Sequence, residues 1–187
     1  MYKWIRKGVR LEKGKLTVRS IVRVTLIVAV GLPMIAGPAS ADVTPGIRVY
    51  NRMDGSRLAV LENGTAFGLR SPTLHDSTAR WSVDERADGH TVFRNEQADK
   101  CLQPGTAAPA PGDPLVIRAC DGSPLQDWSR RAEETLADSP TGWGTFRPRL
   151  DPGLAIAVGE RGSLHLDADQ NSTDRLWRLA RGTNTWW

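Results

Sequence analysis

The sequence is poor in the residues on which most catalytic and metal sites depend. Its 187 residues include two cysteines, Cys101 and Cys120, and three histidines. Two thiols with no histidine close by in sequence cannot complete a tetrahedral zinc shell. No His-Glu-x-x-His, Gly-x-Ser-x-Gly or glycine-rich phosphate-binding motif occurs. Neighbouring acids such as Asp84-Glu85 are typical of solvated loops rather than of the carboxylate pair of a glycosidase. The sequence therefore predicts no metal, no cofactor and no enzymatic activity.

An apolar run long enough to cross a membrane is also missing. Residues 24–36 form an apolar run of 13 residues, interrupted by a glycine and a proline, whereas a membrane span needs about 20. A basic leader precedes this run, and the small-x-small site Ala39-Ser40-Ala41 follows it. This order is typical of a secretory signal peptide, with a membrane anchor as the alternative. We expect residues 1–41 to be cleaved and residues 42–187 to be secreted, with no stable membrane anchor.

A net positive charge is missing outside that leader. The first 41 residues hold eight of the 25 Lys and Arg residues and one of the 21 acidic residues. The remaining 17 basic and 20 acidic residues give residues 42–187 a formal net charge of −3. A nucleic-acid partner requires a basic face. Nucleic acid is therefore disfavoured as a partner.

Helical periodicity is nearly absent after residue 41. Short alternating runs dominate instead, for example residues 47–50, 91–93 and 164–166, and turn pairs such as Asp88-Gly89 and Asp121-Gly122 separate them. Many short strands with glycine-containing turns predict an all-β barrel or sandwich.

A threefold internal repeat gives more detail. Trp81, Trp128 and Trp177 close three similar segments at spacings of 47 and 49 residues, and residues 47–51, 91–95 and 145–148 open them. Units that repeat in this way bury their apolar faces against their copies. We expect one closed domain over residues 42–187, with pseudo-threefold symmetry and repeats at about 47–86, 87–135 and 141–181.

The middle repeat carries a recognisable pattern. Lys100-Cys101-Leu102 opens it, and Cys120-Asp121-Gly122 followed by Gln126-Asp127-Trp128 closes it. These residues resemble the repeat of the ricin B-chain-like lectins, which ends in Gln-x-Trp. The resemblance implies a β-trefoil built of hairpins, with the three tryptophans buried around the pseudo-threefold axis. The terminal pair Trp186-Trp187 is expected to pack against the open end of the barrel, with a mobile tail or a contact for a partner as the alternatives. Export also favours a disulfide between Cys101 and Cys120 over a reduced pair.

Sugar binding in that family depends on an aspartate two residues after the opening cysteine, an aromatic ring that stacks on the sugar, and polar residues near Gln-x-Trp. By position, the aspartate is replaced by Ala59, Gln103 and Ile156. Counting back twelve residues from each tryptophan places Leu69, Val116 and His165 at the stacking position. Only the third repeat then has a ring.

The third repeat is therefore the predicted sugar site, with the middle repeat as second choice. A solvated hairpin without a site is the alternative for the third repeat. Without the aspartate, the loss of a charge-assisted hydrogen bond costs about 1.5–3 kcal/mol, so binding is expected to be weak. The predicted ligand-binding residues are His165, Asp169, Asn171, Asp174 and Arg175 in the third repeat, and Gln103, Asp121 and Gln126 in the middle repeat.

Two function classes follow from these observations. The first is a secreted, non-enzymatic, lectin-like module that binds carbohydrate through weakened sites. The second is a trefoil scaffold that binds a protein partner, for example as an inhibitor, and no longer binds sugar. The fold is the same for both, so a site must decide between them.

Overall fold

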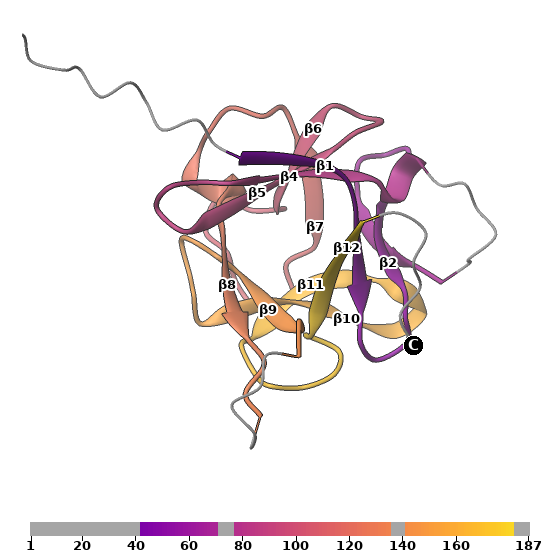
Figure 1. Ribbon diagram of the computed structural model, residues 1–187, viewed down its shortest axis with the longest axis vertical. Helices are drawn as coiled ribbons and strands as arrows, with labels where there is room; N and C mark the ends of the chain where they lie inside the picture. Colours follow the sequence, from indigo (N-terminus) through magenta and orange to yellow (C-terminus); the bar gives the residue numbers. More distant parts are fainter. Residues whose placement is uncertain (1–41, 71–76, 136–140, 182–187) are drawn as a thin grey trace, which may run out of the picture. The chain divides into compact units, whose positions relative to one another are not determined.

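The computed structural model describes residues 42–70, 77–135 and 141–181 (Figure 1). The predicted signal peptide and the pair Trp186-Trp187 lie outside these residues. Among the described residues, no helix is long and apolar enough to cross a membrane.

The described chain is built of short strands and three single-turn 3₁₀ helices. The prediction of an all-β fold is confirmed. The strands are β1 (Asp42–Asn51), β2 (Arg57–Val60), β3 (Ala66–Leu69), β4 (Trp81–Glu85), β5 (His90–Asn95), β6 (Lys100–Pro104), β7 (Leu115–Arg118), β8 (Trp128–Ala132), β9 (Gly144–Pro148), β10 (Leu154–Val158), β11 (Leu164–Ala168) and β12 (Trp177–Arg181). The 3₁₀ helices are η1 (Ser77–Ala79), η2 (Pro124–Gln126) and η3 (Glu160–Gly162).

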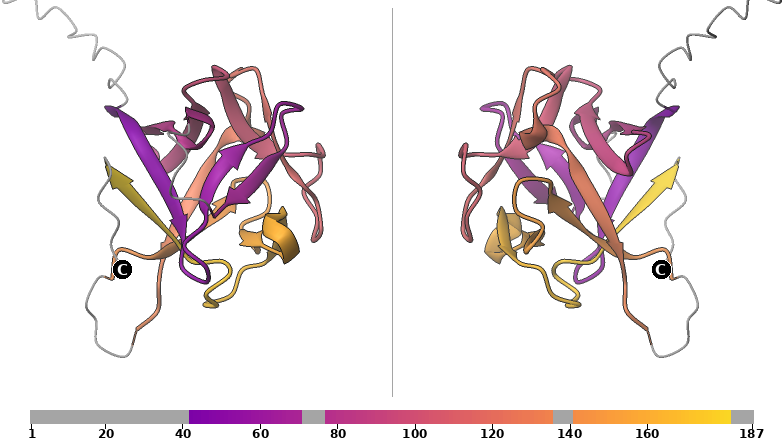
Figure 2. Two further views of the ribbon diagram at one scale, coloured as in Figure 1. Left: turned by 90° about the vertical axis from the view of Figure 1, so that its right-hand side faces the viewer. Right: turned by 90° about the vertical axis from the view of Figure 1, so that its left-hand side faces the viewer.

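Six of the strands close a barrel. Within each repeat the first and fourth strands pair: β1 with β4, β5 with β8, and β9 with β12. The fourth strand of each repeat also pairs with the first strand of the next, and β12 returns to β1. The other strands form the hairpins β2–β3, β6–β7 and β10–β11. Figure 2 shows these hairpins on one side of the barrel, opposite the first residues of β1 and the last residues of β12.

The three hairpins contact one another through bridges that obey threefold symmetry. Each bridge joins the residue just before the second strand of one hairpin to a residue within the second strand of the next hairpin. The bridges are Thr65 with Val116, Pro114 with His165, and Ser163 with Phe67. Phe67, Val116 and His165 are therefore structurally equivalent, as are Thr65, Pro114 and Ser163. The barrel and its threefold cap make the domain a β-trefoil.

The three repeat-closing tryptophans fill the core. Each is at most 1% exposed. Their indole N–H groups donate to hairpin carbonyl oxygens: Trp81 to Leu58 at 2.9 Å, Trp128 to Leu102 at 3.1 Å, and Trp177 to Ile156 at 2.8 Å. A buried indole needs such a partner, because an unpaired buried N–H costs about 1–3 kcal/mol. The structural role predicted for these tryptophans is confirmed.

Two asparagines join successive repeats. The side-chain amide of Asn51 donates to the carbonyl of Asp174 at 2.9 Å, and that of Asn95 donates to the carbonyl of Thr78 at 2.8 Å. At the equivalent place the third repeat has Pro148, which cannot donate such a bond. Asn95 thereby fixes the end of the first repeat beside the start of the second, where the candidate site lies.

The predicted disulfide is confirmed. Cys101 and Cys120 are bonded, with their Cα atoms 5.0 Å apart. The bond spans the β6–β7 hairpin of the second repeat. In the chain-entropy model, closing a loop of this length stabilises the fold by about 3 kcal/mol.

Candidate functional site

The tryptophan hydrogen bonds fix how the three repeats align. Leu58, Leu102 and Ile156 accept these bonds and are therefore equivalent. The residues that follow them, Ala59, Gln103 and Ala157, occupy the position of the family's sugar-binding aspartate. The assignment of Ile156 to that position was wrong by one residue, because Ile156 is itself the carbonyl acceptor. The conclusion that no repeat keeps the aspartate holds for Ala157 as well.

Hairpin register corrects the ring position in the same way. The stacking ring should lie directly across the hairpin from the aspartate position, because opposite residues of two paired strands share one face. From the sequence, this ring was placed twelve residues before each tryptophan. In the first repeat this count gave Leu69, but Trp81 follows Phe67 by 14 positions, whereas Trp128 and Trp177 follow Val116 and His165 by 12. The register pairs Ala59 with Phe67, Gln103 with Val116, and Ala157 with His165. The first repeat therefore has a ring, Phe67, which the tryptophan count missed.

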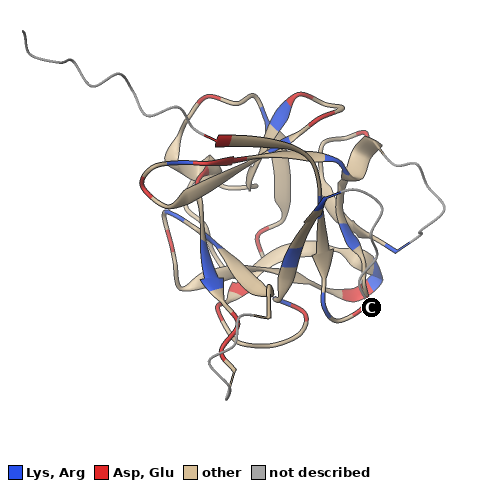
Figure 3. Ribbon diagram, in the orientation of Figure 1, with Lys and Arg blue, Asp and Glu red and all other residues tan. Residues whose placement is uncertain are grey.

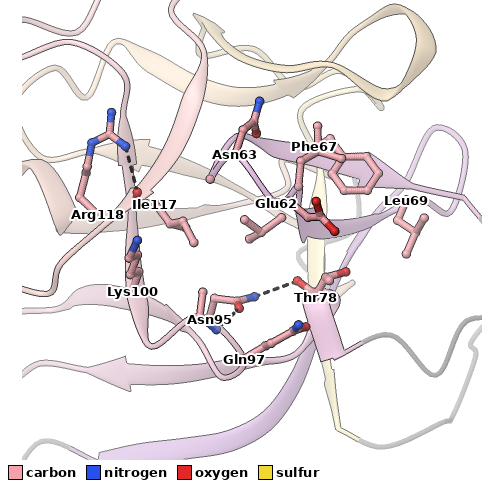
Figure 4. A pocket seen from close by; sticks show the side chains of 14 residues that line it. Glu62, Asn63, Phe67, Leu69, Thr78, Asn95, Gln97, Lys100, Ile117 and Arg118 are labelled. Atoms are coloured by element: carbon pink, nitrogen blue, oxygen red, sulfur yellow. Dashed lines mark hydrogen bonds between the residues drawn. The ribbon is translucent and has the colours of Figure 1, made fainter.

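A cavity of about 640 Å³ lies beside this ring, between the first and second repeats. The β2–β3 hairpin and its turn form one wall, and η1, the β5–β6 turn and β7 complete the enclosure. Figure 4 shows Phe67 and Leu69 on one side, and Lys100 and Arg118 on the opposite side. The cavity thus combines an aromatic and aliphatic wall with a cationic end.

The cavity also has polar side chains on its lining. Asn63, on the β2–β3 turn, accepts a hydrogen bond from the backbone N–H of Thr65 at 2.9 Å. Gln97, on the β5–β6 turn, accepts from the Ser77 hydroxyl at 2.6 Å. An amide side chain carries both donors and acceptors. These two groups can therefore bond to hydroxyl groups of a ligand in either direction.

In the third repeat, two predicted site residues are bonded to β8 and to the segment directly after it. The carboxylate of Asp169 accepts two hydrogen bonds from the guanidinium of Arg131, at 2.7 and 2.9 Å. Asn171 donates to the carbonyl of Glu134 at 2.9 Å and accepts from its backbone N–H at 3.3 Å. Burial raises the pKa of Asp169, but the hydrogen bonds from Arg131 and others outweigh it and leave that pKa below its usual value. Both side chains tie the third repeat to the second.

The other third-repeat residues form a separate group. Arg175 pairs with Asp167 and, at 3.0 Å, with Asp174. His165 packs against the chain at Gly159, where an added Cβ would lie 2.9 Å from its Cε1 atom. The predicted third-repeat residues therefore have separate partners: Asp169 and Asn171 bond to the second repeat, Asp174 pairs with Arg175, and His165 packs at Gly159. Sugar binding at these residues stays a prediction.

The middle-repeat residues do come together, around one buried amide. Gln126 is 1% exposed and donates to the carbonyl of Ala119 at 2.7 Å and to the side chain of Gln103 at 3.1 Å. It also accepts from the backbone N–H of Asp121 at 3.2 Å. These hydrogen bonds give partners to the backbone polar groups of Ala119 and Asp121 at the base of the β6–β7 hairpin. Asp121 is exposed, and a hydrogen bond from the backbone of Ser123 lowers its pKa.

Residues of positive and negative charge are interspersed along the ribbon (Figure 3), and several of them form ion pairs. The buried carboxylate of Asp127, for example, forms ion pairs with Arg86 at 2.7 Å and with Arg149 at 3.0 Å. Within the described ranges, no three His, Cys, Asp or Glu side chains gather as a metal site would require.

Several solved structures share this fold. The designed threefold-symmetric protein ThreeFoil is similar with a TM-score of 0.60 at 18% identity, over 72% of this chain and 97% of that chain. A ricin B-like lectin from Macrolepiota procera, solved with lactose, gives a TM-score of 0.61 at 12% identity, over 78% and 99%. An exo-β-1,3-galactanase from Clostridium thermocellum gives 0.61 at 18% identity, over 74% of this chain and 30% of that chain.

At these identities the likeness shows the fold, a ricin B-like β-trefoil. The chain matches less than a third of the length of the galactanase. No protein-family model and no curated protein sequence matches the chain.

Proposed function

We propose that the protein is a secreted, non-enzymatic carbohydrate-binding module whose glycan site is the cavity of the first repeat. The observation that carries this proposal is the position of Phe67. The threefold bridges make it equivalent to His165, it lies opposite Ala59 in the hairpin, and it lines a cavity of about 640 Å³. A ring in that position of a ricin B-like trefoil is suited to stack on a sugar.

The cavity matches the surface chemistry of a sugar. A pyranose ring presents C–H groups on its faces and hydroxyl groups at its edge. Phe67 and Leu69, with the 45% exposed Leu61, offer an apolar wall for such a face. Asn63 and Gln97 belong to the same lining, and their amide groups can bond to ring-edge hydroxyls. The volume also falls within the roughly 300–1,000 Å³ of ordinary ligand sites.

The proposed binding is weak for a physical reason. Ala59 stands at the position of the aspartate and is fully buried. Its methyl side chain cannot accept a hydrogen bond. The missing charge-assisted hydrogen bond costs about 1.5–3 kcal/mol, which is about one to two decades in affinity. Dissociation constants near the millimolar range are therefore expected.

Known neighbours support a glycan as the ligand. The Macrolepiota lectin is solved in complex with lactose, and the galactanase contains the same fold within a larger chain. Export is the expectation from the basic leader, the apolar run of residues 24–36 and the small-x-small site Ala39-Ser40-Ala41. The intact mass of the secreted protein should correspond to a chain that starts at Asp42; a chain that retains residues 24–36 would contradict export by cleavage.

Titration with oligosaccharides, followed by backbone amide shifts, tests both the function and the site. We expect shifts at Asn63, Phe67 and Gln97. Shifts confined to His165 and Asp174 would move the site to the third repeat. If no glycan produces any shift, the function as a sugar-binding module is wrong, and the protein-binding scaffold becomes the better explanation.

A further inference from the structure

We propose that the first-repeat cavity selects an anionic sugar, whose carboxylate or sulfate group is held by Lys100 and Arg118. This inference rests on the proposed function, because it names the class of glycan for the same site. It starts from the cationic end of the cavity, which none of the expected sugar contacts requires.

Both cationic residues belong to the same end of the β6–β7 hairpin. Arg118 lies directly across the hairpin from Cys101, and Lys100 is the next residue along β6. The disulfide between Cys101 and Cys120 crosses the same end of the hairpin. The disulfide therefore constrains the backbone positions from which the two exposed side chains extend.

Both cations lack the acidic partners that other basic residues have. Arg131, Arg149 and Arg175 each form ion pairs with at least one carboxylate. Over the part of the chain that the structure describes, Lys100 and Arg118 form no ion pair, and both are exposed. Arg118 donates to the carbonyl of Ile117 at 3.4 Å, which leaves its positive charge uncompensated. An anionic ligand group would supply the missing negative charge.

One acid, Glu62, also lines the cavity, and its place orients the ligand. It belongs to the β2–β3 turn and lies on the Phe67 side, away from Lys100 (Figure 4). Two cations face one carboxylate, so the lining residues have a net positive charge. The anionic group should therefore point toward Lys100 and Arg118, with the sugar ring against Phe67.

The expected effects follow from the exposure of these charges. An exposed ion pair contributes about 0.2–1 kcal/mol, so Lys100→Ala and Arg118→Ala should each weaken binding of an acidic glycan about two- to fivefold. Binding of the matching neutral glycan should not change. Glu62→Gln removes the repelling carboxylate at nearly constant shape, so it should strengthen acidic-glycan binding and leave neutral-glycan binding unaltered.

The test begins with a glycan array that carries neutral, uronic-acid and sulfated oligosaccharides. The biotinylated protein is applied as a streptavidin tetramer, because several linked sites raise weak binding to a detectable level. The best acidic ligand is then titrated against the unaltered protein and the three variants. A uronic-acid ligand is compared with its methyl ester, and a sulfated ligand with its desulfated form.

Preference for acidic glycans supports the inference if it is lost in the ester or desulfated ligand and reduced in Lys100→Ala and Arg118→Ala. Raising the ionic strength to about 0.5 M should also reduce it. If only uronic-acid ligands bind, the recognised group is a carboxylate. If only sulfated ligands bind, it is a sulfate. Equal or better binding of neutral glycans, or acidic binding unaffected by both alanine variants, overturns the inference but leaves the sugar-binding function standing. No binding to any glycan overturns the function itself.

Discussion

The β2–β3 hairpin of the first repeat and the β10–β11 hairpin of the third share one register and differ in what surrounds them. Phe67 and His165 occupy equivalent positions, opposite Ala59 and Ala157. Phe67 borders a cavity whose far end has two cations without acidic partners. Near His165, by contrast, Asp167 and Asp174 are paired with Arg175.

This difference shows that the trefoil backbone fixes where a ligand site can form, while side chains from the adjoining repeat decide whether it is available. In the third repeat, a sugar hydroxyl would have to replace the two hydrogen bonds between Asp169 and Arg131. Each hydrogen bond to a charged group is worth about 1.5–3 kcal/mol, so the exchange is unfavourable. In the first repeat, a ligand meets charge that is still uncompensated.

The largest expected effect comes from the second repeat, which supplies the cationic wall of the cavity. Cys120→Ala opens the disulfide with Cys101 and should lower the free energy of unfolding by about 3 kcal/mol. The cause is the added conformational freedom of the unfolded chain. Urea unfolding of the variant and the unaltered protein measures the difference. A loss below about 1 kcal/mol would show that the hairpin is held by its hydrogen bonds alone.

The ion pair that distinguishes the third repeat should have the next largest effect. Asp169→Asn removes the charge that binds Arg131, and we expect unfolding to become easier by about 1–3 kcal/mol. Asp121→Asn is the matched control, because that exposed carboxylate forms no ion pair with the described residues. The control should lower the urea midpoint much less than Asp169→Asn does. Equal midpoints for both variants would contradict a stabilising role for Asp169.

The same ion pair predicts how stability depends on pH. The pKa of Asp169 lies below 3.8 in the folded protein, because the hydrogen bonds and charge of Arg131 outweigh the effect of burial. Its contribution is therefore present above about pH 4 and disappears as the pH falls through the folded pKa. The stability difference between the unaltered protein and Asp169→Asn should be constant above about pH 5 and should shrink as the pH falls below about 4. A constant difference would exclude protonation of Asp169 as the cause.

The fold could be predicted from the sequence alone because three repeated tryptophans mark its pseudo-threefold repeats. Trp81, Trp128 and Trp177 are buried and bonded as the repeat pattern predicts. The disulfide also followed from the expected export. Each of these features depends on one residue type whose burial or pairing has few alternatives.

The site was harder to predict because its alignment depends on loop length. Two extra residues before Trp81 displaced the expected ring from Phe67 to Leu69. The turn Asn63-Gly64, which follows β2 closely, was the better reference point for the first hairpin. Lys100 and Gln97 were missed for another reason. They belong to the second repeat and reach the first repeat's cavity only through tertiary packing, which no count within one repeat reveals.

Removal of the first-repeat ring should have a moderate effect, on binding rather than on stability. Phe67→Ala deletes the wall that faces the sugar, and we expect about a tenfold loss of glycan affinity, close to the 1.4 kcal/mol that one decade represents. Phe67 is half-buried outside the main core, so the variant should still fold. Amide-shift titration gives the affinity, and the unchanged dispersion of the spectrum checks the fold. Full affinity in Phe67→Ala would remove the first repeat from consideration.

The smallest expected effect belongs to the equivalent ring of the third repeat, and it separates the two site assignments most clearly. His165→Ala should change glycan affinity less than about twofold, because His165 does not line the first-repeat cavity. The earlier expectation from sequence is the opposite, since a third-repeat site would lose its only ring. The two rings have equivalent backbone positions, so Phe67→Ala and His165→Ala are matched substitutions in one fold. Loss of binding in His165→Ala alone would return the site to the third repeat, and equal losses in both variants would indicate two sites in the same domain.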